Sequence, residues 1–136
     1  MDTVESNLNQ IEKGYKMSEK EAENILNDRK LTQEKVSLAI DKAASNKGKL
    51  GEVWDYLQSF FSIVSDYING RYKEIPKGSI IAIFASLLYF LSPIDFIPDF
   101  IPGIGFIDDI FVIGLVVNQI KSDLNDYMVW KAKNTK

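Results

Sequence analysis

The chain has 136 residues, carries a formal net charge of −3 and contains neither cysteine nor histidine. This length suits one domain with a single buried core. The missing cysteine excludes disulfides and thiolate metal sites, and the missing histidine excludes Ser-His-Asp triads and nearly all common zinc sites. Catalysis would have to depend on carboxylates, lysine, tyrosine or a hard cation, so the composition leans toward a non-enzymatic protein.

The first ten residues, MDTVESNLNQ, are acidic and polar, which is not the pattern of a signal peptide. We therefore expect a cytoplasmic protein, either free in the cytoplasm or at the cytoplasmic face of the membrane. The acidic net charge, without a cluster of basic and aromatic residues, argues against nucleic acid as a partner.

The N-terminal segment, residues 1–48, has the pattern of successive amphipathic helices. A first short helix is predicted from apolar residues at helical spacing, namely Val4, Leu8, Ile11 and Tyr15. Ser18 and Glu21 form a capping-box pattern, so a second helix is expected to begin there. Thr32 is expected to cap a third helix, and SNKGKLG (residues 45–51) is the clearest break after it.

The second segment, residues 49–136, is mostly apolar helix. A broad stripe of apolar and aromatic side chains predicts one helix from about Leu50 to Asn69, ended by Gly70. The following run, SIIAIFASLLYFL (residues 79–91), is apolar on every side, which is typical of a helix buried in protein or in contact with lipid.

The last predicted helix covers about residues 110–130 and keeps one apolar stripe, formed by Ile113, Val117, Ile120, Leu124 and Tyr127. Small residues at positions 78, 82 and 86 would let a neighbouring helix approach closely, and Gly114 is the expected contact. The fold class is therefore all-α: a small bundle of five to six helices, one compact domain, around a central apolar antiparallel helix hairpin.

The loop between these two helices, SPIDFIPDFIPGIGFIDD (residues 92–109), contains Asp95, Asp99, Asp108 and Asp109. Each has a structural explanation, because Asp95 and Asp99 follow helix-start patterns with proline, and Asp108 and Asp109 suit the positive end of the last helix. The alternative is that the four carboxylates gather at one end of the hairpin and bind Mg²⁺ or Ca²⁺. Helix capping is the preferred interpretation.

The stretch from RYKEIP through YFLSPIDFIPDFIPGIGFIDD into the next apolar helix resembles the YkvA-like family, over residues about 70–121. The matching positions are Pro93, Asp95, Pro98, Asp99, Pro102, Gly103, Gly105, Asp108 and Asp109. The resemblance implies a small bacterial helical domain, of a kind often predicted to be membrane-associated. It implies no established reaction, substrate or cofactor.

The length of the apolar segments argues against two membrane spans. The first holds about thirteen uninterrupted residues, roughly 20 Å of helix, whereas a span needs about twenty residues. A re-entrant hairpin remains an alternative, since basic residues flank it on both sides: Arg71, Lys73 and Lys77 before it and Lys121 after it. The core of a soluble bundle is preferred, because the stripe of residues 50–69 requires an equally apolar partner.

These observations favour a non-enzymatic interaction module whose apolar hairpin docks to a membrane surface or to a protein partner, a second copy of the chain included. The competing hypothesis is a divalent-metal site formed by the four aspartates of the loop, conceivably that of a metal-dependent hydrolase. An enzyme of that kind would also need a substrate cleft beside the loop.

Overall fold

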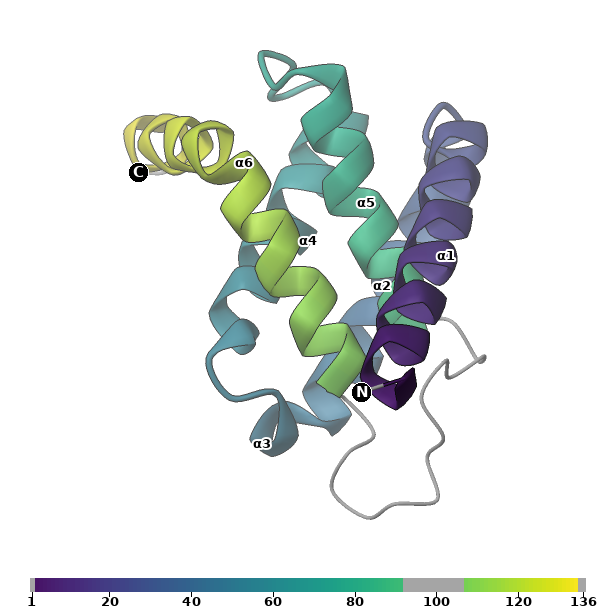
Figure 1. Cartoon of the computed structure of the whole chain (residues 1–136). Coiled ribbons are helices and arrows are strands. Elements are labelled where there is room, and N and C mark those ends of the chain that lie inside the picture. The colour runs from purple at the N-terminus through teal and green to yellow at the C-terminus, as the bar shows by residue number, and fades with distance from the viewer. Residues whose placement is uncertain (1, 92–106, 135–136) are drawn as a thin grey trace.

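The computed structural model describes residues 2–91 and 107–134, and within these ranges it contains helices but no strand. The helices are α1 (Asp2–Ile25), α2 (Arg29–Ser45), α3 (Lys47–Leu50), α4 (Val53–Ile68), α5 (Lys77–Leu91) and α6 (Ile107–Asn134) (Figure 1). The prediction of an all-α fold is confirmed for the described residues.

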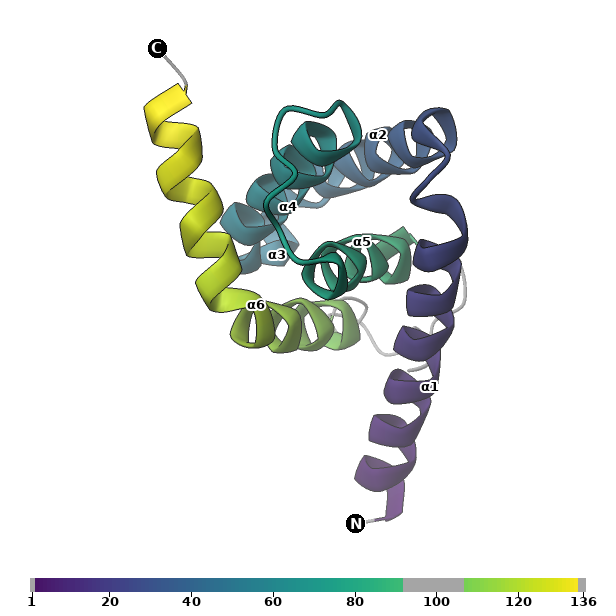
Figure 2. The same cartoon turned by 90° about the horizontal axis from the view of Figure 1, so that it is seen from above.

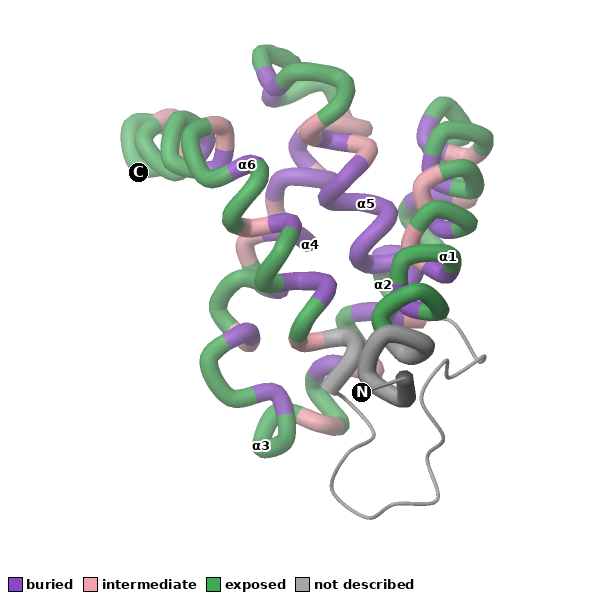
Figure 3. Tube along the Cα trace, in the orientation of Figure 1, coloured by how far each residue is buried: buried purple, intermediate pink, exposed green. Residues whose placement is uncertain are grey.

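Helix α5 lies at the centre of the bundle, where it contacts α1, α2, α4 and α6 (Figure 2). Its side chains from Ile80 to Phe90 are buried, apart from the half-buried Ile81 (Figure 3). The helix is apolar all round because every one of its faces meets protein. The first half of α6 runs antiparallel to α5, and α4 contacts both helices, as predicted.

The N-terminal segment differs from its prediction. Helix α1 runs without a break through Ser18, which is therefore not an N-cap. Ser18 continues the inward stripe, since Ile11, Tyr15, Ser18 and Ala22 follow one another at steps of four, three and four residues. Its side chain is buried, and the packing of this stripe against α5 outweighs the local capping signal.

A second difference concerns the start of α2. Its N-cap is Asp28, whose Oδ1 accepts a hydrogen bond from the backbone N–H of Leu31 at 3.0 Å. Thr32, the predicted cap, is buried inside the helix, and its hydroxyl donates to the carbonyl of Ile25 at 2.9 Å. The carbonyl of Ile25, at the end of α1, thereby accepts a second hydrogen bond beside the one from the backbone N–H of Asp28 at 2.9 Å.

The expected contact between Gly114 and the small residues of α5 is also wrong. Gly114 is exposed, and a Cβ added there would meet nothing within 4 Å. Helix α6 turns Ile113 and Val116 toward the core, which places Gly114 on the outer face. Gly78 is exposed as well, and Ala82 of the small strip meets α1 instead, where the Tyr15 hydroxyl donates to its carbonyl at 3.5 Å.

Helix α4 ends as the sequence predicts, at a glycine in the left-handed region. Gly70 has φ +77°, and its N–H donates to the carbonyl of Tyr67 at 3.1 Å. The N–H of Arg71 donates to the carbonyl of Asp66 at 2.9 Å, which completes a Schellman motif. The motif brings the side chains of Asp66 and Arg71 to the same end of the helix.

Replacing Gly70 by alanine is expected to lower the free energy of unfolding by about 1 to 2 kcal/mol, because an L-residue is strained at positive φ. Gly114→Ala is the matched control, since this exposed helical glycine has open space for a methyl group and should gain about 0.5 to 1 kcal/mol. Urea unfolding followed by circular dichroism measures both. Equal changes at the two positions would contradict the Schellman assignment.

Candidate functional site

Two of the four aspartates of the predicted site fall outside the described residues. Asp95 and Asp99 lie in the segment that is not described, whereas Asp108 and Asp109 belong to the first turn of α6. This backbone position suits a negative charge, because the helix dipole is positive at its N-terminus. Among the residues that the structure describes, no group of three or more acidic side chains could hold a metal ion. The Mg²⁺ or Ca²⁺ site stays a prediction.

Replacing Asp108 or Asp109 by asparagine is expected to lower the free energy of unfolding by about 0.3 to 1 kcal/mol, through loss of the favourable charge at the helix start. If the carboxylates shared a cation, the same variants would gain stability in metal-free buffer, because repulsion among them would be relieved. Thermal melts with and without Mg²⁺, Ca²⁺ and Mn²⁺ separate the two cases. A metal at a hundred times its Kd would add about 2.7 kcal/mol to the wild type.

An apolar cleft of about 330 Å³ lies between α1 and the first half of α6. Its α1 wall consists of Leu8, Ile11, Glu12 and Tyr15. Its α6 wall consists of Phe111, Val112, Leu115, Val116 and Gln119. Leu8, Phe111 and Leu115 are exposed, at 44%, 42% and 54% of their surfaces, although large apolar side chains are normally buried. We call these nine residues the α1–α6 cleft.

The α1–α6 cleft offers little chemistry beyond its apolar surface. Burial raises the pKa of the Tyr15 hydroxyl well above its usual range, and the nearby Glu19 raises it further, so this group stays protonated. Glu12 is exposed and pairs with Lys16 at 3.1 Å, one helical turn further along α1. The cleft is therefore suited to binding an apolar group and not to activating a nucleophile.

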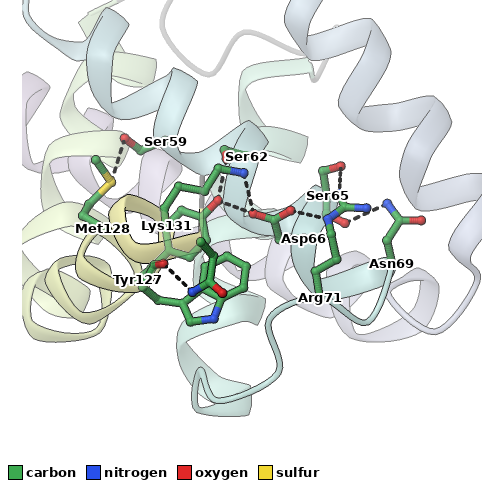
Figure 4. Close-up of polar contacts among 11 residues, drawn as sticks. Ser59, Ser62, Ser65, Asp66, Asn69, Arg71, Tyr127, Met128 and Lys131 are labelled. Atoms are coloured by element: carbon green, nitrogen blue, oxygen red, sulfur yellow. Dashed lines mark hydrogen bonds and ion pairs between the residues drawn. The ribbon is translucent and has the colours of Figure 1, made fainter. Parts of the chain in front are cut away.

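A separate feature, polar in character, surrounds Asp66 near the end of α4 (Figure 4). It was not predicted from the sequence. The side chain of Asp66 is 2% exposed, and its Oδ1 accepts from Arg71 Nε at 2.6 Å. Its Oδ2 accepts from the Tyr127 hydroxyl at 2.6 Å and from Lys131 Nζ at 3.0 Å. The buried carboxylate thus links α4 to the connection after it and to the C-terminal half of α6.

Burial by itself would raise the pKa of Asp66, but hydrogen bonds from Tyr127, Arg71 and Lys131, with the charge of Lys131, outweigh it. The pKa of Asp66 is therefore held below its ordinary value, and the group is ionised at neutral pH. Burial and the hydrogen bond to Asp66 raise the pKa of Tyr127 well above its usual range. The Asp66 cluster, consisting of Asp66, Arg71, Tyr127 and Lys131, is a satisfied ionic network.

A serine beside the Asp66 cluster, Ser62, raises the question of a proton relay. The Ser62 hydroxyl shares a hydrogen bond with the hydroxyl of Tyr127, which in turn donates to Asp66. A relay would require Asp66 to accept a proton, yet two cations hold this carboxylate ionised. Because a poor base cannot activate a hydroxyl, the chain of contacts has a structural role.

One signal in the sequence pointed to the Asp66 cluster. Asp66 follows Ile63 by three residues and stands between Val64 and Tyr67, so helical spacing turns it toward the packed face of α4. A carboxylate on such a face needs a partner, and Arg71 follows just beyond the helix-ending Gly70. The partners from α6 are more than 60 residues away along the chain and required the fold.

The fold and the cleft define a small all-α domain built around one central, largely buried helix, α5. The family described as a protein of unknown function, DUF1232, matches residues 79–115, which include α5 and the beginning of α6. The chain is also 38% identical over 76 residues to the "uncharacterized membrane protein YkvA" of Bacillus subtilis (strain 168). That match covers 56% of this chain and 72% of the relative.

The chain belongs to the YkvA-like family of unknown function, as the loop motif implied. No solved structure matches it at a significant level. The residues matched by the family supply α5 and most of the α6 wall of the cleft, while the α1 wall lies outside them. No described helix is both long and apolar enough to cross a membrane.

Proposed function

We propose that the protein is a non-enzymatic interaction module that binds an apolar helical segment of a protein partner in the α1–α6 cleft. The observation that supports this proposal is the exposure of Leu8, Phe111 and Leu115 around one apolar hollow. An amphipathic helix that lays its apolar face into a groove is a common mode of protein recognition. The volume of the cleft is suited to one or two large apolar side chains.

The charge around the cleft favours a protein over a lipid surface. Among the described residues that line it, none is lysine or arginine, and the one acid, Glu12, is neutralised by Lys16. Peripheral binding to anionic lipid ordinarily uses basic residues beside the inserted apolar ones. A concave, nearly uncharged wall is better matched to a projecting side chain of another protein.

Site-specific photo-crosslinking in cells tests the proposal with two matched positions. Leu115 in the cleft and Leu38 on α2 are both 54% exposed, so a photoreactive residue is equally accessible at either. We expect a defined crosslinked partner from position 115 and none from position 38. The crosslink should weaken by about tenfold or more when Leu8→Asp places a charge in the opposite wall, since an apolar contact would then bury an unpaired carboxylate.

Equal crosslinking at the two positions, or a crosslink insensitive to Leu8→Asp, would refute the docking function. A crosslinked product of twice the chain mass, together with dimers in gel filtration, would identify the partner as a second copy of this protein.

A membrane surface is the second candidate, because the Bacillus subtilis relative is called a membrane protein. In this version Phe111 and Leu115 insert into the cytoplasmic leaflet from the cytoplasmic side. Flotation with vesicles of mixed neutral and anionic lipid distinguishes the two candidates. Flotation of the wild type that is lost in Leu115→Asp and kept in Leu38→Asp would replace the protein partner by the membrane.

A further inference from the structure

Helix α6 consists of two parts that meet at Ile120. The backbone of this residue is not helical, with φ −108° and ψ 18°, and the helix changes direction there (Figure 2). The first part contributes Val112, Ile113 and Val116 to the central core. The second part, residues 121–134, leaves the direction of the first part (Figure 1), and its Tyr127 and Lys131 contact Asp66 near the end of α4.

The second part of α6 is held to the body through a few identifiable contacts. The Tyr127 hydroxyl and Lys131 Nζ both donate to Oδ2 of Asp66. Tyr72 lies in the connection between α4 and α5. Its ring centroid is 5.1 Å from that of Tyr127 and 4.9 Å from that of Trp130. Nearer to Ile120, Asp123 accepts a hydrogen bond from Ser79 at the start of α5.

These contacts differ in kind from those that hold α5. In residues 121–134 the buried apolar side chains are Leu124 and Tyr127, whereas Val129 is exposed and Met128, also about half-exposed, accepts a hydrogen bond from the Ser59 hydroxyl of α4 at 3.9 Å. The cations of the Asp66 cluster are half-exposed, since Arg71 keeps 54% and Lys131 keeps 40% of its side-chain surface in water. Water can replace their hydrogen bonds when the segment moves away, so local opening costs less than global unfolding.

We propose that residues 121–134 form an arm that opens as a unit about Ile120. In the closed state the hydrogen bonds from Tyr127 and Lys131 to Asp66 hold the arm in place. The other helices stay packed during this motion. The closed arm covers the Asp66 carboxylate and the ring of Tyr72, and the open arm presents both to solvent as an acidic and aromatic surface. This proposal is independent of the α1–α6 cleft, which lies on the other side of Ile120.

Amide hydrogen exchange of the full chain, followed by mass spectrometry, tests the arm. In Asp66→Asn the carboxylate no longer binds Lys131, and exchange across residues 121–134 should accelerate by about tenfold or more, the scale expected for lost hydrogen bonds to a charged group. Exchange across residues 79–91 requires unfolding of the core, in which the contacts to Asp66 are also lost, so it should accelerate by a similar factor and stay slower than exchange in the arm. Equal protection of the arm and of residues 79–91 in the wild type, or arm exchange that does not respond to Asp66→Asn, would overturn the proposal.

Two further variants keep the result interpretable. Val64→Ala weakens the core of α4 without removing a contact to Asp66, so it should accelerate exchange in α5 and leave exchange in the arm unchanged, because Val64 stays packed when the arm opens. Lys131→Met removes one donor and should give the pattern of Asp66→Asn at a smaller amplitude; it decides the question if Asp66→Asn does not fold.

In a Trp54→Phe background Trp130 is the remaining tryptophan, and its fluorescence should become more sensitive to acrylamide when Lys131 is replaced.

Discussion

Replacing Phe84 by alanine is expected to lower the free energy of unfolding by about 3 to 5 kcal/mol, the usual cost of removing a buried phenyl ring. Phe84 lies in the middle of α5 and is fully buried among the surrounding helices. The loss combines the transfer free energy of the ring with the cavity that it leaves. Denaturant unfolding in detergent-free buffer measures it.

The matched control is Phe111→Ala, the same substitution on an apolar part of α6. Phe111 is 42% exposed, so its loss should change stability by about 0.5 kcal/mol or less. The pair of variants separates the two readings of the apolar hairpin. If α5 served to contact lipid, Phe84→Ala would leave the free protein as stable as Phe111→Ala does.

Removing both cations of the Asp66 cluster, in Arg71→Met/Lys131→Met, is expected to cost about 3 to 5 kcal/mol, because it leaves a buried carboxylate without a charged partner. Asp66→Asn should cost less, about 1 to 3 kcal/mol, since it removes hydrogen bonds to a charged group but strands no charge. The two cations that paired with Asp66 are half-exposed and can turn toward water. Methionine preserves the apolar stems of the side chains that it replaces.

The pH dependence of these variants has a defined sign. In the wild type the folded-state pKa of Asp66 lies below its ordinary value of 3.8, so the cluster stabilises the fold above that pH and loses its contribution as the pH falls further. In Arg71→Met/Lys131→Met, burial becomes the dominant influence and raises the pKa. The folded state then binds the proton more tightly than the unfolded chain, so stability should increase as the pH is lowered toward 4.

Unfolding of the wild type and of this double variant between neutral pH and about pH 4, the ordinary pKa range of aspartate, measures that difference. A double variant that loses stability in parallel with the wild type would show that the carboxylate is not held charged by Arg71 and Lys131. Asp55→Asn, an exposed change on the same helix, controls for removing a negative charge from α4.

The helical periodicity of apolar residues predicted the helices well where the residues at helical spacing are also the buried ones. The stripe of α4 and the all-round apolar character of α5 each led to the observed helix, within a few residues at the ends. The local cap signals misled at Ser18 and Thr32, because both residues face the core and packing against distant helices decided their positions. A capping pattern contributes about 1 kcal/mol, which a buried stripe readily exceeds.

The candidate site was less accessible to sequence reasoning. The stripe of Leu8, Ile11 and Tyr15 was recognised, but which part of it remains uncovered depends on how far α6 diverges from α1. Gly114 was expected inside because nothing local distinguishes the two apolar faces of the first half of α6. Which of those faces meets α5 is a property of the assembled bundle.

The continuous helix α1 has a consequence for how the protein folds during its synthesis. Its Tyr15 contacts Ala82, which is 67 residues later in the chain. At about 5 to 20 residues per second, roughly 3 to 13 s separate the translation of these two residues. Throughout that interval α1 lacks its main partner, α5, and the face that packs against α5 stays uncovered. The domain therefore acquires its core only after α5 has emerged, so a ribosome stalled before α5 would hold a protease-sensitive chain.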